Sequence, residues 1–294
     1  MQCEKNRIGL IIPTLNAGDN FDALLTEISS QTLALSSRLI IDSSSDDNTT
    51  AIAKKHGYSI IQIPRHSFGH GRTRQQAFAF MSGDVDYIIY LTQDVRLTDN
   101  SSLANLLAPI RSDDAIGACY GRQLPYKEAC FEARILREFN YPSTSRAAVY
   151  ADRKKYGIKT AFLSDSFAVY RKTALEYIGG FPVDVQICED MYAGAMLLKA
   201  GYKIFYAADA MVYHSHNFTL KEHWQRYREM GRFQRQNKEL LKDFGTSEGE
   251  GKKLLQIMLK HGYTEGGLSQ CLKIIVSSLV KYAAFAFGRY IGKV

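Results

Sequence analysis

The sequence predicts an α/β fold built on a doubly wound, mostly parallel central sheet. Three observations predict it: short apolar runs of strand type alternate with short helical segments, polar turns close these runs, and 46% of the 294 residues are apolar. Such alternation implies right-handed crossovers between parallel strands. We expect two α/β halves, over residues 1–120 and 121–217, followed by a basic helical C-terminal extension over residues 218–294.

The first strand is expected at Ile8–Pro13, a buried apolar run that ends at a proline. Continuous apolar runs indicate buried strands, and apolar residues repeated every three to four positions indicate helices. The further expected strands are 38–42, 59–63, 87–94, 165–170, 203–206 and 211–214. The expected helices lie around 24–28, from about 49, over 72–81, 132–138 and 173–178, from 189 to about 201, and from about 220 onward.

The bulk composition limits the partners of the chain. A net charge of +7 and a pI near 9.0 favour anionic partners, such as phosphates or an acidic membrane face. Aromatic residues do not interleave with the basic ones, so we expect no nucleic acid partner. The five cysteines show no C-x-x-C spacing, and no secretory h-region precedes the first strand. We therefore expect a cytoplasmic protein.

The segment 272–294 is apolar and cationic together, because Lys273, Lys281, Arg289 and Lys293 interrupt its apolar runs. No uncharged run approaches the roughly 20 residues that a membrane-spanning helix needs. Two interpretations remain open. The segment forms an interfacial helix on an anionic leaflet, or it forms a terminal helix that packs on the protein's own core.

Asp42 ends the second expected strand and precedes a serine-rich turn. A carboxylate at this position can accept the imide N–H of uracil or thymine. Alternatively, Asp42 caps the helix that begins near Thr49, together with Asp46 and Asp47.

The segment Phe68–Arg74 follows the third strand and opens a helix. Its glycines would let backbone amides approach a phosphate, with Arg72 or Arg74 adding charge. Arg74 occupies the last glycine position of a dinucleotide fingerprint, so the segment departs from that motif. The sequence contains no G-x-x-x-x-G-K-[ST] segment, which excludes nucleotide hydrolysis of P-loop type.

Asp94 ends the apolar run that begins at Tyr87. Open α/β sheets bind ligands just outside the carboxyl ends of their strands. Because Mg²⁺ binds through one or two carboxylates plus substrate phosphates, Asp94 is a candidate metal ligand. The alternative is that Asp94 only turns the chain at the strand exit.

Glu189 and Asp190 begin a helix, where acidic residues also suit the helix dipole. An ionised carboxylate is what a general base needs to accept a hydroxyl proton. His214 and His216 put two imidazoles on one strand face, although a zinc site would need further ligands.

Taken together and in this order, these segments resemble the inverting family-2 glycosyltransferases of GT-A fold. The resemblance runs from Ile8 to about Gly231. Its carriers are Ile11–Asn16, Ile41–Asp46, Leu91–Asp94, Gly179–Pro182, Glu189–Asp190 and Tyr213–His214.

The resemblance implies a site. Asp94 and His214 would bind Mg²⁺ or Mn²⁺, and Asp190, beside Glu189, would be the catalytic base. Thr92–Gln93–Asp94 stands where the family has D-x-D, so the first carboxylate of that motif is missing. The residues that would contact the nucleotide are Pro13, Thr14, Asn16, Asp42, Arg72, Arg74, Thr92 and Gln93.

Thr92–Gln93–Asp94 together with His214–Ser215–His216 is similar to the rhamnosyltransferase branch of this family. That likeness implies a dTDP-rhamnose donor, a UDP-sugar being the alternative, and a polysaccharide or polyprenyl-linked acceptor. It also implies peripheral contact with an anionic membrane, on the cytoplasmic face of the inner membrane. A sugar nucleotidyltransferase is a rival, but it needs a lysine in the loop after the first strand, where Thr14–Gly18 has none. A non-catalytic basic binding module is the third possibility.

Overall fold

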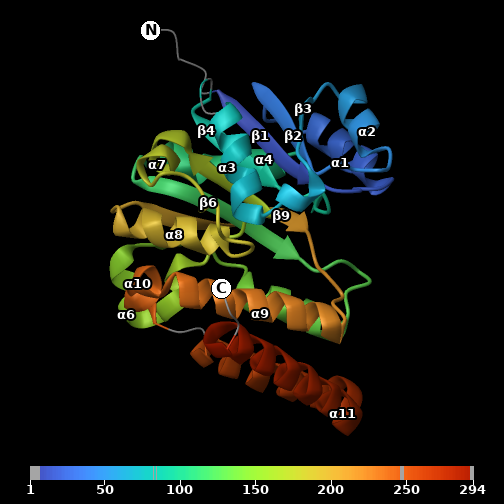
Figure 1. The fold of residues 1–294 in the computed structure, drawn as a ribbon, viewed down its shortest axis with the longest axis vertical. Coiled ribbons are helices and arrows are strands. Elements are labelled where there is room, and N and C mark those ends of the chain that lie inside the picture. Colours follow the sequence, from blue (N-terminus) through green and yellow to red (C-terminus); the bar gives the residue numbers. More distant parts are fainter. Residues whose placement is uncertain (1–6, 82, 84, 246–247, 292–294) are drawn as a thin grey trace.

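A nine-stranded sheet forms the centre of the molecule in a computed structural model that describes residues 7–81, 83, 85–245 and 248–291 (Figure 1). The strand order is β3-β2-β1-β4-β8-β6-β9-β5, and β7 pairs with β9 outside this path. The sheet runs without a break through both expected α/β halves. The domain boundaries near residues 120 and 217 stay a prediction, and Lys293 and the first six residues lie outside the described part.

The first half of the sheet is parallel. The strands are β1 (Ile8–Thr14), β2 (Ser37–Asp42), β3 (Ser59–Gln62) and β4 (Tyr87–Leu91), and β1 lies between β2 and β4. They alternate with the helices α1 (Asn20–Ser29), α2 (Thr49–Lys55) and α3 (His70–Met81). This arrangement confirms the predicted doubly wound fold, since right-handed crossovers carry helices to the faces of the sheet.

Two apolar clusters cover the two faces of the sheet. Ile11, Ile88 and Tyr90 belong to one cluster with residues of α3, whereas Leu10 and Ile89 belong to the other with residues of α1. Neighbouring residues of a strand point to opposite faces. The continuous apolar runs of β1 and β4 are therefore buried on both sides.

The second half of the sheet mixes directions. Strand β8 (Phe167–Arg171) runs antiparallel to both β4 and β6 (Ile116–Leu124), and β6 runs parallel to β9 (Lys203–Tyr213). Sequence reasoning predicted two short strands in place of β9, and this was wrong. The pairing of β6 with β9 is interrupted after Ala207 and resumes at Met211. A bulge therefore interrupts the pairing within one continuous strand.

The remaining elements complete the core and its cover. The other strands and helices before residue 200 are β5 (Arg96–Leu97), β7 (Arg146–Ala148), α4 (Ser102–Ser112), α5 (Phe131–Asn140), α6 (Arg153–Tyr156), α7 (Lys172–Tyr177) and α8 (Glu189–Lys199). Short 3₁₀ helices occupy Arg65–Ser67, Tyr150–Asp152, Gly157–Ala161 and Lys242–Phe244.

The C-terminal part is helical, as predicted. Helix α9 (Leu220–Gln236) begins with a capping box between Thr219 and Glu222, and α10 (Lys238–Leu241) follows. Helix α11 (Glu248–Ala286) is divided into two arms at Gly267, where φ is 60°. The arms pack against each other, since Met258 and Ile274 share one apolar cluster and Cys271 Sγ lies 3.7 Å from the Leu259 carbonyl. The second arm continues into a π-helical turn at Phe287–Ile291. Helix α9 lies between the sheet and α11 (Figure 1).

Candidate active site

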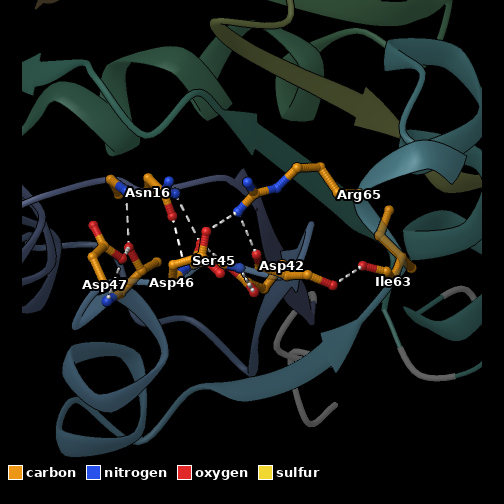
Figure 2. Close-up of polar contacts among 10 residues, drawn as sticks. Asn16, Asp42, Ser45, Asp46, Asp47, Ile63 and Arg65 are labelled. Carbon is orange, nitrogen blue, oxygen red and sulfur yellow. Dashed lines mark hydrogen bonds and ion pairs between the residues drawn. The ribbon is translucent and has the colours of Figure 1, made fainter.

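Polar loops meet at the carboxyl ends of β1, β2 and β4, as the fold predicts. Gln93 joins two of these ends, since its side-chain oxygen accepts from the Leu15 N–H at 2.8 Å and its amide nitrogen donates to the Leu15 carbonyl at 3.0 Å. The Asn16 side chain accepts from the Asp46 N–H at 2.8 Å, and the Asn16 N–H donates to Ser45 Oγ at 2.8 Å (Figure 2). Both Gln93 and Asn16 therefore hold loop backbone in place.

Asp42 organises this corner from inside. Its side chain is fully buried, and its carboxylate accepts from Thr14 Oγ1 at 2.8 Å, Ser45 Oγ at 2.6 Å and the Ser45 N–H at 2.9 Å. Asp47 caps α2 through the Thr49 N–H at 3.0 Å. Asp42 therefore holds the loop to β1 and does not contact the start of α2, so the alternative that Asp42 caps this helix was wrong. Recognition of a base by Asp42 stays a prediction.

Arg65, which the sequence analysis did not predict as a site residue, begins the short 3₁₀ helix after β3 and contacts the same loop. Its guanidinium donates to the Ser44 carbonyl at 2.8 Å and pairs with Asp46 at 2.6 Å (Figure 2). The side chain is about half exposed, so a cation lines the rim of this corner.

The predicted metal ligands come together. Nε2 of His214 and Nε2 of His216 each lie 3.4 Å from Oδ2 of Asp94, and one ligand atom from each of these residues lies within 4.8 Å of the others. Burial acts to raise the pKa of Asp94, but the hydrogen bond and charge of His214, with His216, outweigh it and hold this pKa below its usual range. The sequence analysis named His216 beside His214 but did not predict it as a ligand of the metal.

A buried amide orients His214. Oε1 of Gln123 lies 2.8 Å from His214 Nδ1, and Nε2 of Gln123 donates to Ser164 Oγ at 2.8 Å. An amide oxygen can only accept, so Nδ1 of His214 carries a proton, and in the neutral ring Nε2 offers its lone pair to a cation. One carboxylate and two imidazoles so arranged fit a divalent cation, with phosphate oxygens completing its coordination.

A second cluster of charges lies around Arg74, which is 3% exposed. Its Nη1 lies 2.7 Å from Glu189 and its Nε lies 3.2 Å from Asp165. Both carboxylates are buried as well: Asp165 lies two residues before β8, and Glu189 begins α8. Arg74 and Glu189 neutralise each other. The nucleotide contact expected of Arg74 and the catalytic role expected of Glu189 stay predictions.

Asp190 is the carboxylate of this cluster without an ion pair among the described residues. It accepts hydrogen bonds from the Met191 N–H at 2.7 Å and from the backbone of Asp165. Burial and the neighbouring charge of Glu189 raise the pKa of Asp190 to about 7, and Arg74 opposes the shift. Burial likewise raises the pKa of Asp165. A carboxylate of raised pKa is suited to proton transfer near neutral pH.

Arg226 of α9 links the two clusters electrostatically. Burial chiefly lowers the pKa of His214, and Arg226 adds to this shift. Burial and Asp190 raise the pKa of the Cys188 thiol, which Arg226 opposes. The guanidinium therefore lies within electrostatic reach of Asp190 and of the possible cation site formed by Asp94, His214 and His216, called the cation triad below.

The remaining predicted residues lie at the edges of the site. Arg72 is about half exposed and lies 3.8 Å from Asp184, and Pro13 and Thr14 end β1 beside β2. The Thr92 N–H donates to the Ser166 carbonyl at 3.3 Å. The sequence analysis did not predict Asp165 or Gln123 as residues of the site. An acid near the start of a strand was the only local signal for Asp165, and no local signal marked Gln123.

A possible cation site at the carboxyl edge of the sheet, on an α/β fold of this topology, is the arrangement of a glycosyltransferase of GT-A type. The chain belongs to glycosyl transferase family 2, which residues 10–179 match. It is 43% identical over 260 residues to the O-antigen chain rhamnosyltransferase RfbN of Salmonella typhimurium (strain LT2), covering 87% of this chain and 82% of that protein. It is 40% identical over 257 residues to the O-antigen chain rhamnosyltransferase WbaN of Salmonella anatum, covering 86% and 81%.

Solved structures share the fold. The mannosyltransferase PcManGT from Pyrobaculum calidifontis, in complex with GDP-Man and Mn²⁺, superposes with a TM-score of 0.62 at 16% identity, covering 99% of this chain and 77% of that chain. S. aureus TarS 1–349 in complex with UDP-GlcNAc gives a TM-score of 0.59 at 12% identity, covering 96% and 90%. These likenesses confirm the predicted fold.

Proposed function

We propose that this protein is an inverting rhamnosyltransferase that moves L-rhamnose from dTDP-rhamnose to a hydroxyl of a growing surface polysaccharide. One observation carries the proposal: two relatives at 43% and 40% identity, aligned over more than 80% of their length, are O-antigen chain rhamnosyltransferases. The site supports it because it combines a cation triad with a separate proton acceptor.

The donor nucleoside would bind at the corner formed by Pro13, Thr14, Asn16 and Asp42. This corner is rigid, because Asp42 and Asn16 hold its backbone through the hydrogen bonds described above. The diphosphate would extend toward Asp94, which directly follows Gln93. Arg226 and Arg72 supply positive charge along that path.

Asp94, His214 and His216 would hold the cation. We favour Mn²⁺ over Mg²⁺, because Mg²⁺ prefers a shell of oxygen ligands and two of these three ligands are imidazoles. When bound, the cation would stabilise negative charge on the leaving diphosphate.

Asp190 would accept the proton of the acceptor hydroxyl. Burial and Glu189 raise its proton affinity, while the pairing of Glu189 with Arg74 limits the repulsion between the neighbouring carboxylates. The attacking oxygen then approaches the anomeric carbon from the face opposite the diphosphate. A single displacement of this kind inverts the configuration.

The donor test is a panel of dTDP-rhamnose, UDP-glucose and GDP-mannose with Mn²⁺ and a lipid-linked polysaccharide acceptor. We expect transfer from dTDP-rhamnose and, by NMR, an anomeric configuration opposite to that of the donor. Transfer from the UDP-sugar alone would replace the proposed donor by the alternative. Retention of configuration would exclude Asp190 as the base of a single displacement.

We also propose that α11 rests on an anionic membrane surface. Its exposed apolar residues lie on one helical face, and the side chains of Leu268, Leu272, Leu279 and Tyr282 are each more than 60% exposed. No acidic residue follows Glu265 in the sequence. An apolar face bordered by cations fits the interface of an anionic leaflet.

One side of α11 packs on the protein, where Ile274 and Ala284 are fully buried. Polar contacts with α5 add to this attachment: Glu132 binds Lys281 and accepts from Ser277 Oγ at 3.0 Å, and Arg134 lies 2.5 Å from Glu265. Because that side of the helix is occupied, the exposed apolar face points outward, which supports an additional contact with a membrane surface.

By length and composition alone, the helical stretch Gly249–Ile291 could also cross a membrane, with a mean hydropathy of 1.5 in its most apolar window. We propose the interfacial placement because the polar contacts of Lys281 and Glu265 tie this helix to the catalytic part. The enzyme would then act at the cytoplasmic face of the inner membrane.

Vesicle flotation tests this placement. Leu272→Glu with Leu279→Glu should abolish flotation with phosphatidylglycerol vesicles, because two charges would enter the apolar face. Gln76→Glu, an exposed change on α3, serves as the control and should float like wild type. Flotation of the double variant at the wild-type level would exclude α11 as the membrane contact.

A further inference from the structure

A basic hollow lies between α9 and the π-helical turn at the end of α11, above the point where the two elements touch. It measures about 430 Å³, and its polar lining comes from Arg228, Glu229, Arg232 and Arg235. The three arginines recur at spacings of four and three residues, so they share one face of α9. Glu229 pairs with Arg228 at 2.9 Å, and the lining keeps a net positive charge.

Two glycines fix the walls of this hollow. A Cβ at Gly231 would lie 2.1 Å from the Phe285 carbonyl, and one at Gly288 would lie 1.9 Å from the Arg228 carbonyl. The helices therefore approach each other backbone to backbone at the floor. Any larger residue would push them apart, so the arginines are held at a fixed distance from the turn.

The rim of the hollow is apolar and aromatic. Phe287 and Ile291 line it, and the Trp224 ring lies 6.1 Å from the Phe287 ring. Ile291 and Tyr290 are 68% and 69% exposed, on the same helix as the exposed apolar face. A cationic floor beneath an apolar rim matches a ligand with an anionic head and a hydrocarbon tail.

We infer that this hollow binds the diphosphate of an isoprenoid lipid, with the isoprenoid chain over Trp224, Phe287 and Tyr290. The inference rests on the proposed function, since a lipid-linked acceptor would bring such a diphosphate to the enzyme. Arginine forms paired hydrogen bonds with phosphate oxygens, and Arg232 makes no ion pair with any side chain in the described part of the chain. Under the proposed function the donor diphosphate would bind elsewhere, at the carboxyl ends of β1, β2 and β4.

Trp224 is the only tryptophan of the chain, so its fluorescence reports directly on this hollow. We expect saturable quenching by farnesyl diphosphate, with weaker binding of inorganic pyrophosphate and of farnesol. Arg232→Gln should weaken farnesyl diphosphate binding about tenfold or more, and Arg232→Lys should lose less. Arg111→Gln, on the exposed end of α4, is the matched control and should bind like wild type.

Several results would overturn the inference. One is equal binding of farnesyl diphosphate and farnesol, and another is wild-type affinity in folded Arg232→Gln. A third is quenching by phosphatidylglycerol vesicles that matches farnesyl diphosphate and is insensitive to Arg232. Binding of dTDP, measured by thermal shift on the same samples, separates this outcome from failure of the proposed function, because the donor site does not include the hollow.

Discussion

Replacing Gln123 by leucine tests how the cation triad is prepared. Gln123 is 1% exposed, and its oxygen is the acceptor for the Nδ1 proton of His214, which is itself 5% exposed. Leucine has nearly the same volume but cannot accept. The variant would leave a buried donor unsatisfied, or it would move the proton to Nε2, where it blocks the lone pair that faces Asp94.

The expected magnitude follows from the cost of an unsatisfied buried donor, about 1–3 kcal/mol. Because about 1.4 kcal/mol corresponds to tenfold in an equilibrium constant, Mn²⁺ affinity should fall by roughly 5- to 150-fold. Loss of an outer-shell partner of a metal ligand typically costs about 10- to 100-fold in affinity. The two estimates agree.

Isothermal titration with Mn²⁺ in the presence of dTDP measures the effect, and urea unfolding checks that the variant is folded. Gln123→Glu is the matched control, since a carboxylate still accepts from Nδ1 and can take a hydrogen bond from Ser164. It should retain most of the affinity. Wild-type Mn²⁺ affinity in folded Gln123→Leu would refute the role of this amide.

Four further results are expected. Asp190→Asn should abolish transfer while dTDP binding survives in a thermal-shift assay, and retained turnover would remove Asp190 as the base. Because Asp190 must be ionised and its pKa is raised to about 7, kcat/KM should rise with pH through about 7. A carboxylate whose pKa is raised by folding contributes its full stability below the pKa of the unfolded chain, near 4. This contribution falls as the pH rises and is lost above the folded pKa of about 7. Asp190→Asn should therefore gain Tm over wild type at pH 8 and gain little at pH 5; an equal gain at both values would contradict the raised pKa. Arg74→Met should lower the free energy of unfolding by about 3–5 kcal/mol, because it leaves Asp165 and Glu189 buried without their counter-ion. A urea titration within 1 kcal/mol of wild type would show that this ion pair is dispensable.

Local sequence patterns were sufficient to predict the positions of site residues that stand at the ends of strands. Asp42 and Asp94 follow apolar runs that could only be buried strands, and parallel strands bring their carboxyl ends to one edge of a sheet. His214 follows β9 and meets Asp94 because β5 and β9 pair there, with Arg96 opposite Tyr213. Fold and topology therefore placed these side chains correctly.

Partners that depend on long-range packing could not be found this way. Gln123 and His214 are 91 residues apart, and neither sequence neighbourhood marks their hydrogen bond. Arg74 carries the same charge whether it meets a phosphate or two carboxylates, and only burial beside Asp165 decides between them. The orientation of α11 depended likewise on Glu132, a residue of another helix.

Electron paramagnetic resonance of Mn²⁺ tests the cation triad most directly, in wild type and in Asp94→Ala and His216→Ala, each with dTDP present. We expect one bound Mn²⁺ in wild type and about tenfold or more weaker binding in both variants. His56→Ala, which removes an imidazole that pairs with Asp22 on α1, should leave the titration unchanged. Wild-type Mn²⁺ binding in Asp94→Ala would contradict the central claim that this carboxylate and the two histidines hold the cation.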